Sequence, residues 1–279
     1  MKLTAPTIVK ALLAKYGLRP SKGLGQNFLI NEHYLKQIVA AAELVGDELV
    51  VEIGSGLGVL TRELAQVAKK VITIEKDRRL LPVLNEVLGD MARVELVLED
   101  ALQVDYQQLV GNNLPAKVVA NLPYYITTPL ITRLLEQEIA WSGLVFLVQS
   151  EVADRMMAGP GSKEYGLLSV MVQWEYDVKR VARVPASAFY PAPKVASTVV
   201  KLIPWARSKP LPVNKEWLGQ VLRSALGQRR KTLLNALTSN LAVTREQVQV
   251  ALSHLGLEAG VRGEDLTPEQ FIQLAAQLV

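Results

Sequence analysis

VVEIGSGLGVLT, residues 50–61, decides the fold of this chain of 279 residues. A short β-branched run ends in alternating glycines from Gly54 to Gly58, and an apolar stretch with helical spacing follows. Glycines at such a strand–turn–helix junction, here Gly54 and Gly56, allow a tight turn and a close approach of the backbone to a ligand at the helix N-terminus. The spacing does not match the GxGxxG fingerprint, because the residues around Leu60 include no glycine at the position where the motif requires its third one. The loop therefore predicts a ligand-binding turn and disfavours a nicotinamide dehydrogenase.

Outward from this loop, short buried runs alternate with amphipathic stretches from residue 49 to about 150. The runs predict strands at Leu49–Ile53, Val71–Glu75, Val94–Leu98, Lys117–Ala120 and Leu144–Val148. The stretches between them predict helices at Val59–Ala68, Arg78–Leu88 and Pro129–Glu138. Strands that alternate with helices indicate an α/β fold with a parallel sheet and right-handed crossovers. Two later segments, Val178–Val184 and Ser197–Ile203, are expected to complete a seven-stranded, mostly parallel sheet with an antiparallel edge.

A boundary is expected at residues 204–212, where PWARSKPLP has the composition of a turn or linker. Beyond it, helical patterns run over Glu216–Leu226, Lys231–Leu241, Thr244–Leu255 and Pro268–Leu278, two of them opening with a Thr-x-x-Gln capping box. The GPGSKEYG stretch at residues 159–166 is expected to be an exposed loop between helical segments. We therefore predict an α/β domain over residues 1–205, with an N-terminal extension over 1–36, and a small all-α domain over 206–279.

The composition excludes several kinds of site. The chain has no cysteine, which rules out disulfides, thiolate metal sites and cysteine nucleophiles. Only His33 and His254 could serve as imidazole ligands, and we interpret both as structural, so no metal site is expected. No signal peptide and no apolar run of membrane-spanning length is recognisable, so a cytoplasmic location without membrane attachment is expected.

The net charge of +4 is unevenly distributed. Residues 1–200 hold as many basic as acidic side chains, whereas residues 201–279 hold 10 Lys and Arg against 6 acids. Such a basic tail favours a polyanionic partner. Arg229, Arg230 and Lys231 precede the helical TLLNAL, where cations oppose the helix dipole. We expect these three side chains to contact phosphates of a nucleic acid.

Acidic residues follow two of the predicted strands. Glu75 ends the second strand and can accept hydrogen bonds from both ribose hydroxyls of a nucleoside, as in Rossmann-type sites. Asp100 ends the third strand in VELVLEDAL and can accept a hydrogen bond from an adenine amino group. Because the carboxyl ends of neighbouring parallel strands line one crevice, both acids are expected to face the same ligand.

NLPYY, residues 121–125, follows the fourth strand and is the most specific motif. An exocyclic adenine nitrogen is a poor nucleophile, since its lone pair is delocalised into the ring. The Asn121 side chain and the Leu122 carbonyl could both accept from N6–H and favour the pyramidal, reactive amine. Pro123 fixes the turn and brings no competing N–H, while the Tyr124 ring can stack an extruded base.

These motifs together resemble the ribosomal RNA adenine dimethyltransferase family. The resemblance runs in order from about residue 20 to the C-terminus. It rests on SKGLGQNFLI (21–30), the glycine loop, Glu75, EDAL, NLPYY, SEVADRMMAGPGSKEYGLLSV (150–170), FYPAPKVASTVVKL (189–202) and RGEDLTPEQF (262–271).

The resemblance implies a class I, Rossmann-like methyltransferase domain and a helical C-terminal RNA-recognition domain. It implies that S-adenosyl-L-methionine is the cofactor and that two adjacent adenines near the 3′ end of small-subunit (16S) rRNA are dimethylated at N6. A role in maturation of the small ribosomal subunit and a monomeric enzyme are expected as well. Among single residues, the resemblance implies that Asn27 and Leu29 close over the cofactor, that Gly54 contacts its methionine part, and that Asn121 lies where the methyl group is transferred. Phe189 is expected to sandwich the target base opposite Tyr124, with core packing as the alternative.

Two positions depart from the family pattern. The family often has Asn where this chain has Tyr125, a change from which we expect little consequence because Asn121 is intact. It often has Lys where this chain has Ser150, so one basic RNA contact is expected to be absent.

Three alternative activities stay open at this stage. The chain could be a large-subunit rRNA adenine N6-methyltransferase, which shares the glycine loop and an Asn-x-Pro-Tyr motif. A DNA adenine methyltransferase is disfavoured, because such enzymes resemble an Asp-Pro-Pro-Tyr pattern. A non-catalytic nucleic-acid-binding assembly or transcription factor on the same fold is disfavoured by the intact NLPY motif.

Overall fold

The computed structural model describes residues 3–112, 115–205, 213–228 and 230–279. Contacts divide the chain into two compact units, which we call the sheet unit (1–153 and 178–204) and the helical unit (154–177 and 205–279). Sequence patterning groups residues 154–177 with the sheet, whereas their contacts lie with the C-terminal helices. One reason is Tyr165, whose fully buried hydroxyl donates to the Leu266 carbonyl at 2.7 Å.

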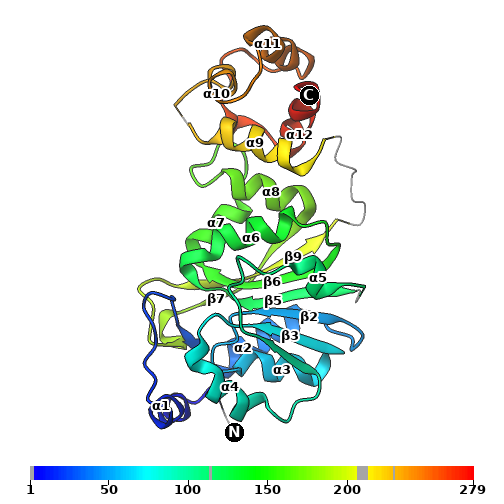
Figure 1. The fold of residues 1–279 in the computed structure, drawn as a ribbon. Helices are drawn as coiled ribbons and strands as arrows, with labels where there is room; N and C mark the ends of the chain where they lie inside the picture. The colour runs from blue at the N-terminus through cyan, green and yellow to red at the C-terminus, as the bar shows by residue number, and fades with distance from the viewer. Residues whose placement is uncertain (1–2, 113–114, 206–212, 229) are drawn as a thin grey trace. The chain divides into compact units, whose positions relative to one another are not determined.

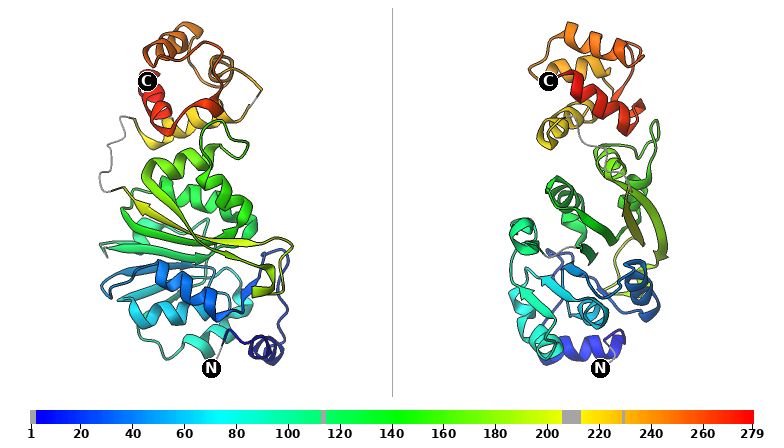
Figure 2. Two further views of the ribbon diagram at one scale, coloured as in Figure 1. Left: turned by 180° about the vertical axis from the view of Figure 1, so that it is seen from behind. Right: turned by 90° about the vertical axis from the view of Figure 1, so that its right-hand side faces the viewer.

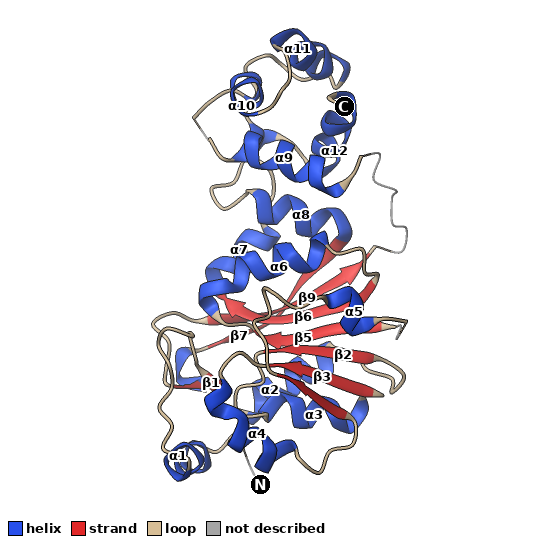
Figure 3. Ribbon diagram, viewed as in Figure 1, coloured by secondary structure: helices blue, strands red, loops and turns tan. Residues whose placement is uncertain are grey.

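The sheet unit contains a seven-stranded sheet with the order β4-β3-β2-β5-β6-β9-β7 (Figures 1 and 3). The pairs β3–β4, β2–β3, β2–β5 and β5–β6 are parallel, and β6–β9 is antiparallel. The α/β class and the mostly parallel seven-stranded sheet are thus confirmed. The strands are β2 (Leu49–Ile53), β3 (Lys70–Ile74), β4 (Val94–Val97), β5 (Ala116–Asn121), β6 (Trp141–Gln149), β7 (Tyr176–Val184) and β9 (Ser197–Pro204).

Helices of the sheet unit flank the sheet (Figure 2), and its central strands β2, β3 and β5 are almost wholly buried. Alternate strand residues such as Val50 and Val71 join one core cluster with the first four helices, while the intervening Val51 and Ile72 are equally buried. This near-continuous burial is the reason why the strands read as unbroken apolar runs in the sequence. The helices of this unit are α1 (Pro6–Lys15), α2 (Glu32–Ala41), α3 (Val59–Val67), α4 (Leu81–Leu88), α5 (Tyr106–Val110), α6 (Thr127–Glu136) and the start of α7 (Ser150–Met157).

The N-terminal extension is part of the sheet unit's core, a packing that sequence patterning did not predict. Helix α1 buries Val9, Leu12 and Leu13 in the same cluster as the sheet. A separate two-stranded sheet pairs β1 (Phe28–Leu29) antiparallel with β8 (Phe189–Tyr190). The start of the chain is therefore tied to a segment near the end of the sheet unit.

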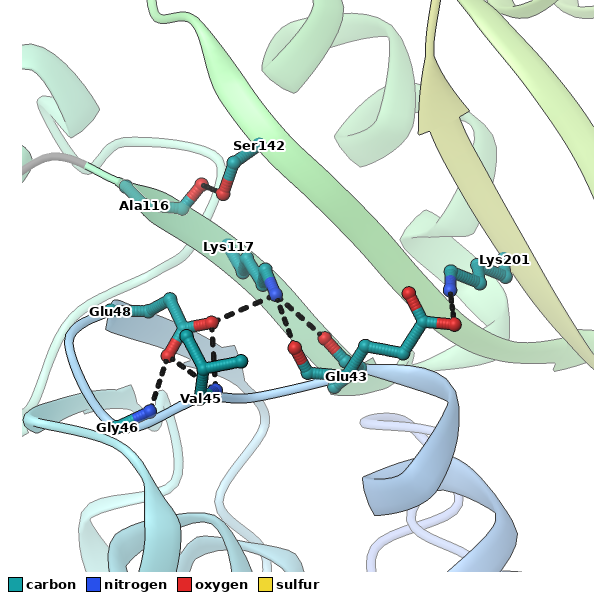
Figure 4. A network of polar contacts seen from close by, with 9 residues as sticks. Glu43, Val45, Gly46, Glu48, Ala116, Lys117, Ser142 and Lys201 are labelled. Carbon is teal, nitrogen blue, oxygen red and sulfur yellow. Dashed lines mark hydrogen bonds and ion pairs between the residues drawn. The ribbon is translucent and has the colours of Figure 1, made fainter.

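A buried ion pair anchors the loop between α2 and β2 (Figure 4). The Lys117 ammonium, near the start of β5, donates to Glu48 at 2.9 Å and to the carbonyls of Ala42 and Glu43 at 2.9 and 2.8 Å. Glu48 also accepts the backbone N–H groups of Val45 and Gly46. These bonds to Lys117 and the backbone outweigh the effect of burial and hold the pKa of Glu48 at about 2.

The helical unit contains α8 (Leu167–Glu175), α9 (Lys215–Leu226), α10 (Leu233–Asn240), α11 (Arg245–His254) and α12 (Pro268–Gln277). The two capping boxes predicted at Thr244 and Thr267 are confirmed. Helix α10 begins later than the sequence pattern indicates, because the Thr232 side chain caps it by accepting from the backbone N–H of Asn235. The GPGSKEYG stretch is a loop, and its Tyr165 is buried in the core of this unit.

Candidate active site

The carboxyl ends of four neighbouring strands open into one cavity. The walls of this cavity include Gly54 after β2, Glu75 after β3, Asp100 after β4 and Asn121 at the end of β5. Residues 24–28 of the N-terminal segment form a further wall. The structure thus brings together the side chains that the sequence placed at separate strand ends, as expected for the crevice of a parallel sheet.

The glycine at position 54 keeps a side chain from projecting beside the cavity. Gly54 has a φ of +81°, and a Cβ atom there would lie 3.6 Å from the Asn121 carbonyl oxygen and 3.7 Å from the Pro123 ring. A side chain at position 54 would therefore project between two walls of the cavity. Gly58 serves packing instead, since a Cβ atom there would lie 3.0 Å from Val87 of α4.

Glu75 presents a buried carboxylate at the cavity. One of its oxygens accepts the Gly56 N–H at 3.0 Å and the other accepts the Asp77 N–H at 2.8 Å. Burial raises the pKa of Glu75, while the two backbone N–H bonds oppose the rise. Each carboxylate oxygen can accept more than one hydrogen bond, so the group is fixed in place and can still receive a diol.

Behind the glycine loop, a second acid lies fully inside the protein. Glu52 of β2 accepts hydrogen bonds from the hydroxyls of Thr61 at 2.5 Å and Thr73 at 2.6 Å, and Thr73 also contacts the Ser55 hydroxyl at 2.6 Å. Burial raises the pKa of Glu52 to about 8. The hydrogen bonds join β2, β3, the glycine loop and the first turn of α3.

Replacing Glu52 with glutamine should change how stability depends on pH. A folded-state pKa of about 8, above the ordinary value of 4.5, means that the folded protein holds this proton more tightly than the unfolded chain. Its contribution is fully present below pH 4.5 and is lost as the pH rises toward 8. Because one pKa unit corresponds to about 1.4 kcal/mol, Glu52→Gln should gain several kcal/mol over the wild type between pH 4.5 and 8. Urea unfolding at both pH values measures this gain, and parallel stability profiles of the two proteins would contradict it.

Asp100 is paired rather than solitary. Its Oδ2 accepts from the Lys76 ammonium at 2.7 Å, and its Oδ1 accepts the Leu102 N–H at 3.0 Å. The bond to Lys76 is the main reason that the pKa of Asp100 is lowered. Lys76 directly follows Glu75, yet the sequence analysis did not single it out.

Hydrogen bonds fix the orientation of Asn121 and Leu122. The Asn121 Nδ2 donates to the Asn27 carbonyl at 3.2 Å, which identifies Oδ1 as the side-chain acceptor. The Leu122 N–H donates to the Leu147 carbonyl of β6 at 3.1 Å, while the Leu122 side chain is buried. Asn27 in turn donates from Nδ2 to the Gly25 carbonyl at 3.0 Å. The N-terminal segment therefore touches the NLPYY motif directly.

The aromatic residues differ in their placement. Tyr124 lines the cavity, and its hydroxyl lies 2.6 Å from that of Ser197, while burial raises its pKa. Phe189 is only 2% exposed, belongs to the core cluster and does not line the cavity, so the structure favours its core-packing interpretation. Leu29 pairs with Phe189, is likewise buried and does not line the cavity either.

A polar contact that the sequence analysis missed fixes the N-terminal wall. The Gln26 side chain donates to Asp77 at 2.8 Å and accepts the Ser21 N–H at 2.8 Å. Asp77 also pairs with Arg79 at 2.7 Å, which is the main reason that its pKa is lowered. No local pattern could have revealed a contact between residues so far apart in the chain.

The predicted basic cluster lies in the helical unit. Arg230 and Lys231 are exposed and precede the N-cap of α10, whereas Arg229 is outside the described residues.

In the parts of the chain that the structure describes, no group of three or more acidic or histidine side chains is arranged to hold a metal ion. None of the helices described combines the length and the hydropathy that a bilayer-spanning segment needs.

Comparisons with known proteins agree with this geometry. The family described as ribosomal RNA adenine dimethylase matches residues 18–278. Proteins named ribosomal RNA small subunit methyltransferase A are similar along their whole length. The protein from Alkaliphilus metalliredigens is 43% identical (99% of this chain, 98% of the relative), and that from Clostridioides difficile is 40% identical (98% and 96%).

Two solved structures share the fold. A dimethyladenosine transferase from Plasmodium falciparum superposes with a TM-score of 0.74 at 30% identity, covering 88% of this chain and 95% of that one. The 23S rRNA methyltransferase ErmE superposes with a TM-score of 0.65 at 28% identity, covering 90% and 99%. Together with the match over nearly the whole sequence, they lead to one conclusion: the chain belongs to the ribosomal RNA adenine dimethylase family.

Proposed function

We propose that the protein dimethylates N6 of two adjacent adenines near the 3′ end of small-subunit (16S) rRNA, using S-adenosyl-L-methionine, during maturation of the small ribosomal subunit. The observation that carries this proposal is the cavity shared by Glu75, Asp100 and Asn121, each at the end of a different parallel strand. The names of the relatives at 40–43% identity support the small subunit as the substrate.

The residues around the cavity fit the cofactor. The Gly54 backbone would lie against its methionine part, the Glu75 carboxylate would accept its ribose hydroxyls, and Asp100 would accept its adenine amino group. A glycine at position 54 leaves the loop backbone without a side chain beside the cavity, and two backbone N–H bonds fix the Glu75 carboxylate in place. When bound, S-adenosyl-L-methionine supplies a methyl group activated by a sulfonium.

The protein's part in the reaction is to orient and polarise the target amine. The Asn121 Oδ1 and the Leu122 carbonyl would accept from the two N6–H groups and favour a lone pair directed out of the adenine ring. The Tyr124 ring would stack the extruded base. No ionised base has to act before the attack, because the amine loses its proton after it gains the methyl group.

Replacing Glu75 with alanine should weaken cofactor binding by about 10- to 100-fold, since hydrogen bonds to a charged group contribute about 1.5–3 kcal/mol. Calorimetric titration with the cofactor measures the loss. RNA affinity, determined separately by filter binding, should change little. Equal losses for cofactor and RNA would indicate general disruption of the glycine loop, because Glu75 also holds Gly56.

The decisive experiment is incubation with labelled cofactor and either unmodified small subunits or large subunits, followed by nucleoside analysis. Label in N6,N6-dimethyladenosine from small subunits is the expected result. Label in the large subunit alone would establish the second candidate, a large-subunit adenine methyltransferase. The structural similarity to ErmE is the reason for testing this candidate. Cofactor and RNA binding without transfer to either subunit would indicate a non-catalytic assembly factor.

Arg229, Arg230 and Lys231 would contact rRNA phosphates, and exposure of the latter two supports this role. The enzyme would act as a monomer in the cytoplasm, where ribosomal subunits mature.

A further inference from the structure

Tyr125 is an aromatic side chain in an unusual place. It is 47% exposed although it lines the cavity. Among the Phe, Tyr and Trp residues that the structure describes, only Tyr125 and Trp205 are exposed. The preceding Tyr124 is half-buried and tied to Ser197. The motif thus presents one anchored ring within the cavity and one open ring at its mouth.

The Tyr125 ring lies beside Gly25 of the N-terminal segment. Gly25 adopts a φ of +59°, and a Cβ atom there would lie 3.4 Å from Cδ1 of Tyr125. A glycine at this position therefore lets the ring rest close to the backbone of the N-terminal segment. That segment is itself fixed through Gln26 and Asp77. A ring that is ordered before binding loses little conformational entropy when a ligand covers its open side.

The segments that meet at the ring carry two lysines and several acids. Lys76 lines the same cavity as Tyr125, where its ammonium donates to Asp100 at 2.7 Å. Lys22 is exposed on the N-terminal segment, and its carbonyl accepts the Gly25 N–H at 3.1 Å. An exposed aromatic surface at the edge of such a cavity suits a nucleobase, which can stack on the open face of the ring.

We propose that Tyr125 stacks the nucleobase next to the target adenine and so positions the RNA strand at the mouth of the cavity. The inference rests on the proposed function, in which an adenine leaves its stack and enters the cavity beside Tyr124. Extrusion of that adenine removes a stacking partner from its neighbour in the strand. The open Tyr125 ring replaces the lost partner, and it does so without reading sequence, because every base has a π-face.

Two variants separate stacking from mere bulk. Tyr125→Phe keeps the ring, and Tyr125→Leu keeps an apolar side chain without a π-face. The full-length protein is mixed with a short RNA in which 2-aminopurine replaces the base next to the acceptor adenine. The probe should stay quenched on binding to the wild type and to Tyr125→Phe, and should brighten with Tyr125→Leu. The KM for this RNA should rise about 10-fold for Tyr125→Leu, the size expected for loss of one base–aromatic stack.

Cofactor binding provides the second readout. Calorimetry should give the wild-type affinity for the cofactor in both variants. If Tyr125→Leu shows the quenching and the KM of the wild type, the inference is wrong. It is also wrong if the variant loses only cofactor affinity, because Tyr125 would then be part of the cofactor site. If the wild type transfers no methyl group to any RNA, the proposed function fails, and the quenching still decides whether Tyr125 stacks a base.

Discussion

Asn121→Ala will slow methyl transfer by about 100- to 1000-fold, the range seen when one preorganised hydrogen-bonding group is removed from an active site. The variant lacks the side-chain oxygen that would accept from N6–H, and only the Leu122 carbonyl remains to polarise the amine. Cofactor affinity should change little, because Glu75 and Asp100 would still hold the ribose and the adenine. Single-turnover transfer to unmodified small subunits measures the rate, and calorimetry measures the affinity.

Asn121→Asp separates the two roles of the Asn121 amide. Aspartate keeps an acceptor oxygen but lacks the Nδ2 donor that binds the Asn27 carbonyl at 3.2 Å. If polarisation of N6 dominates, the aspartate variant should retain a clearly higher rate than the alanine variant. Full activity of Asn121→Ala would show that the side-chain oxygen plays no part. Equal losses in both variants would assign the effect to the contact with the N-terminal segment.

Lys117→Met will lower the free energy of unfolding by about 3 kcal/mol, because removing one partner of a buried ion pair leaves the other charge uncompensated. The side chains of Lys117 and Glu48 are only 14% and 2% exposed, and the same ammonium satisfies the two carbonyls after α2 (Figure 4). The melting temperature should fall by roughly 6–12 °C. Calorimetric unfolding measures both quantities.

The pair formed by Lys70 and Glu95 is the matched control. It has a similar length, 2.6 Å, and Lys70 also lies near the start of a parallel strand, but the two side chains are 43% and 50% exposed. Lys70→Met should therefore cost less than about 1 kcal/mol. Adding Glu48→Gln to Lys117→Met should recover part of the loss by removing the orphaned charge. Equal, small losses at both lysines would refute the assignment of a buried, stabilising pair.

The parts of the fold that could be predicted share one physical cause. Strands β2, β3 and β5 lie inside the sheet and are almost wholly buried, so their sequences are largely apolar runs with recognisable ends. The acids and amides that follow such strands must meet at one edge. For that reason Glu75, Asp100 and Asn121 could be placed at a common cavity from the sequence alone.

The parts that could not be predicted depend on contacts between distant segments. The two-residue strands β1 and β8 are too short to have a pattern of their own, and each exists only because the other is present. Phe189 and Leu29 belong to these strands. The family resemblance implied that both residues act at the site, whereas the structure buries both side chains in the core. The bond from Gln26 to Asp77 likewise joins segments that no local rule connects.

The pairing of β1 with β8 also has a consequence during protein synthesis. The wall formed by residues 24–28 leaves the ribosome early, but the strand that secures it, Phe189–Tyr190, emerges only after nearly the whole sheet unit. A nascent chain therefore carries an incomplete pocket until translation passes residue 190. We expect that this chain cannot modify RNA while most of it is still being made, including the RNA of the very ribosome that is making it.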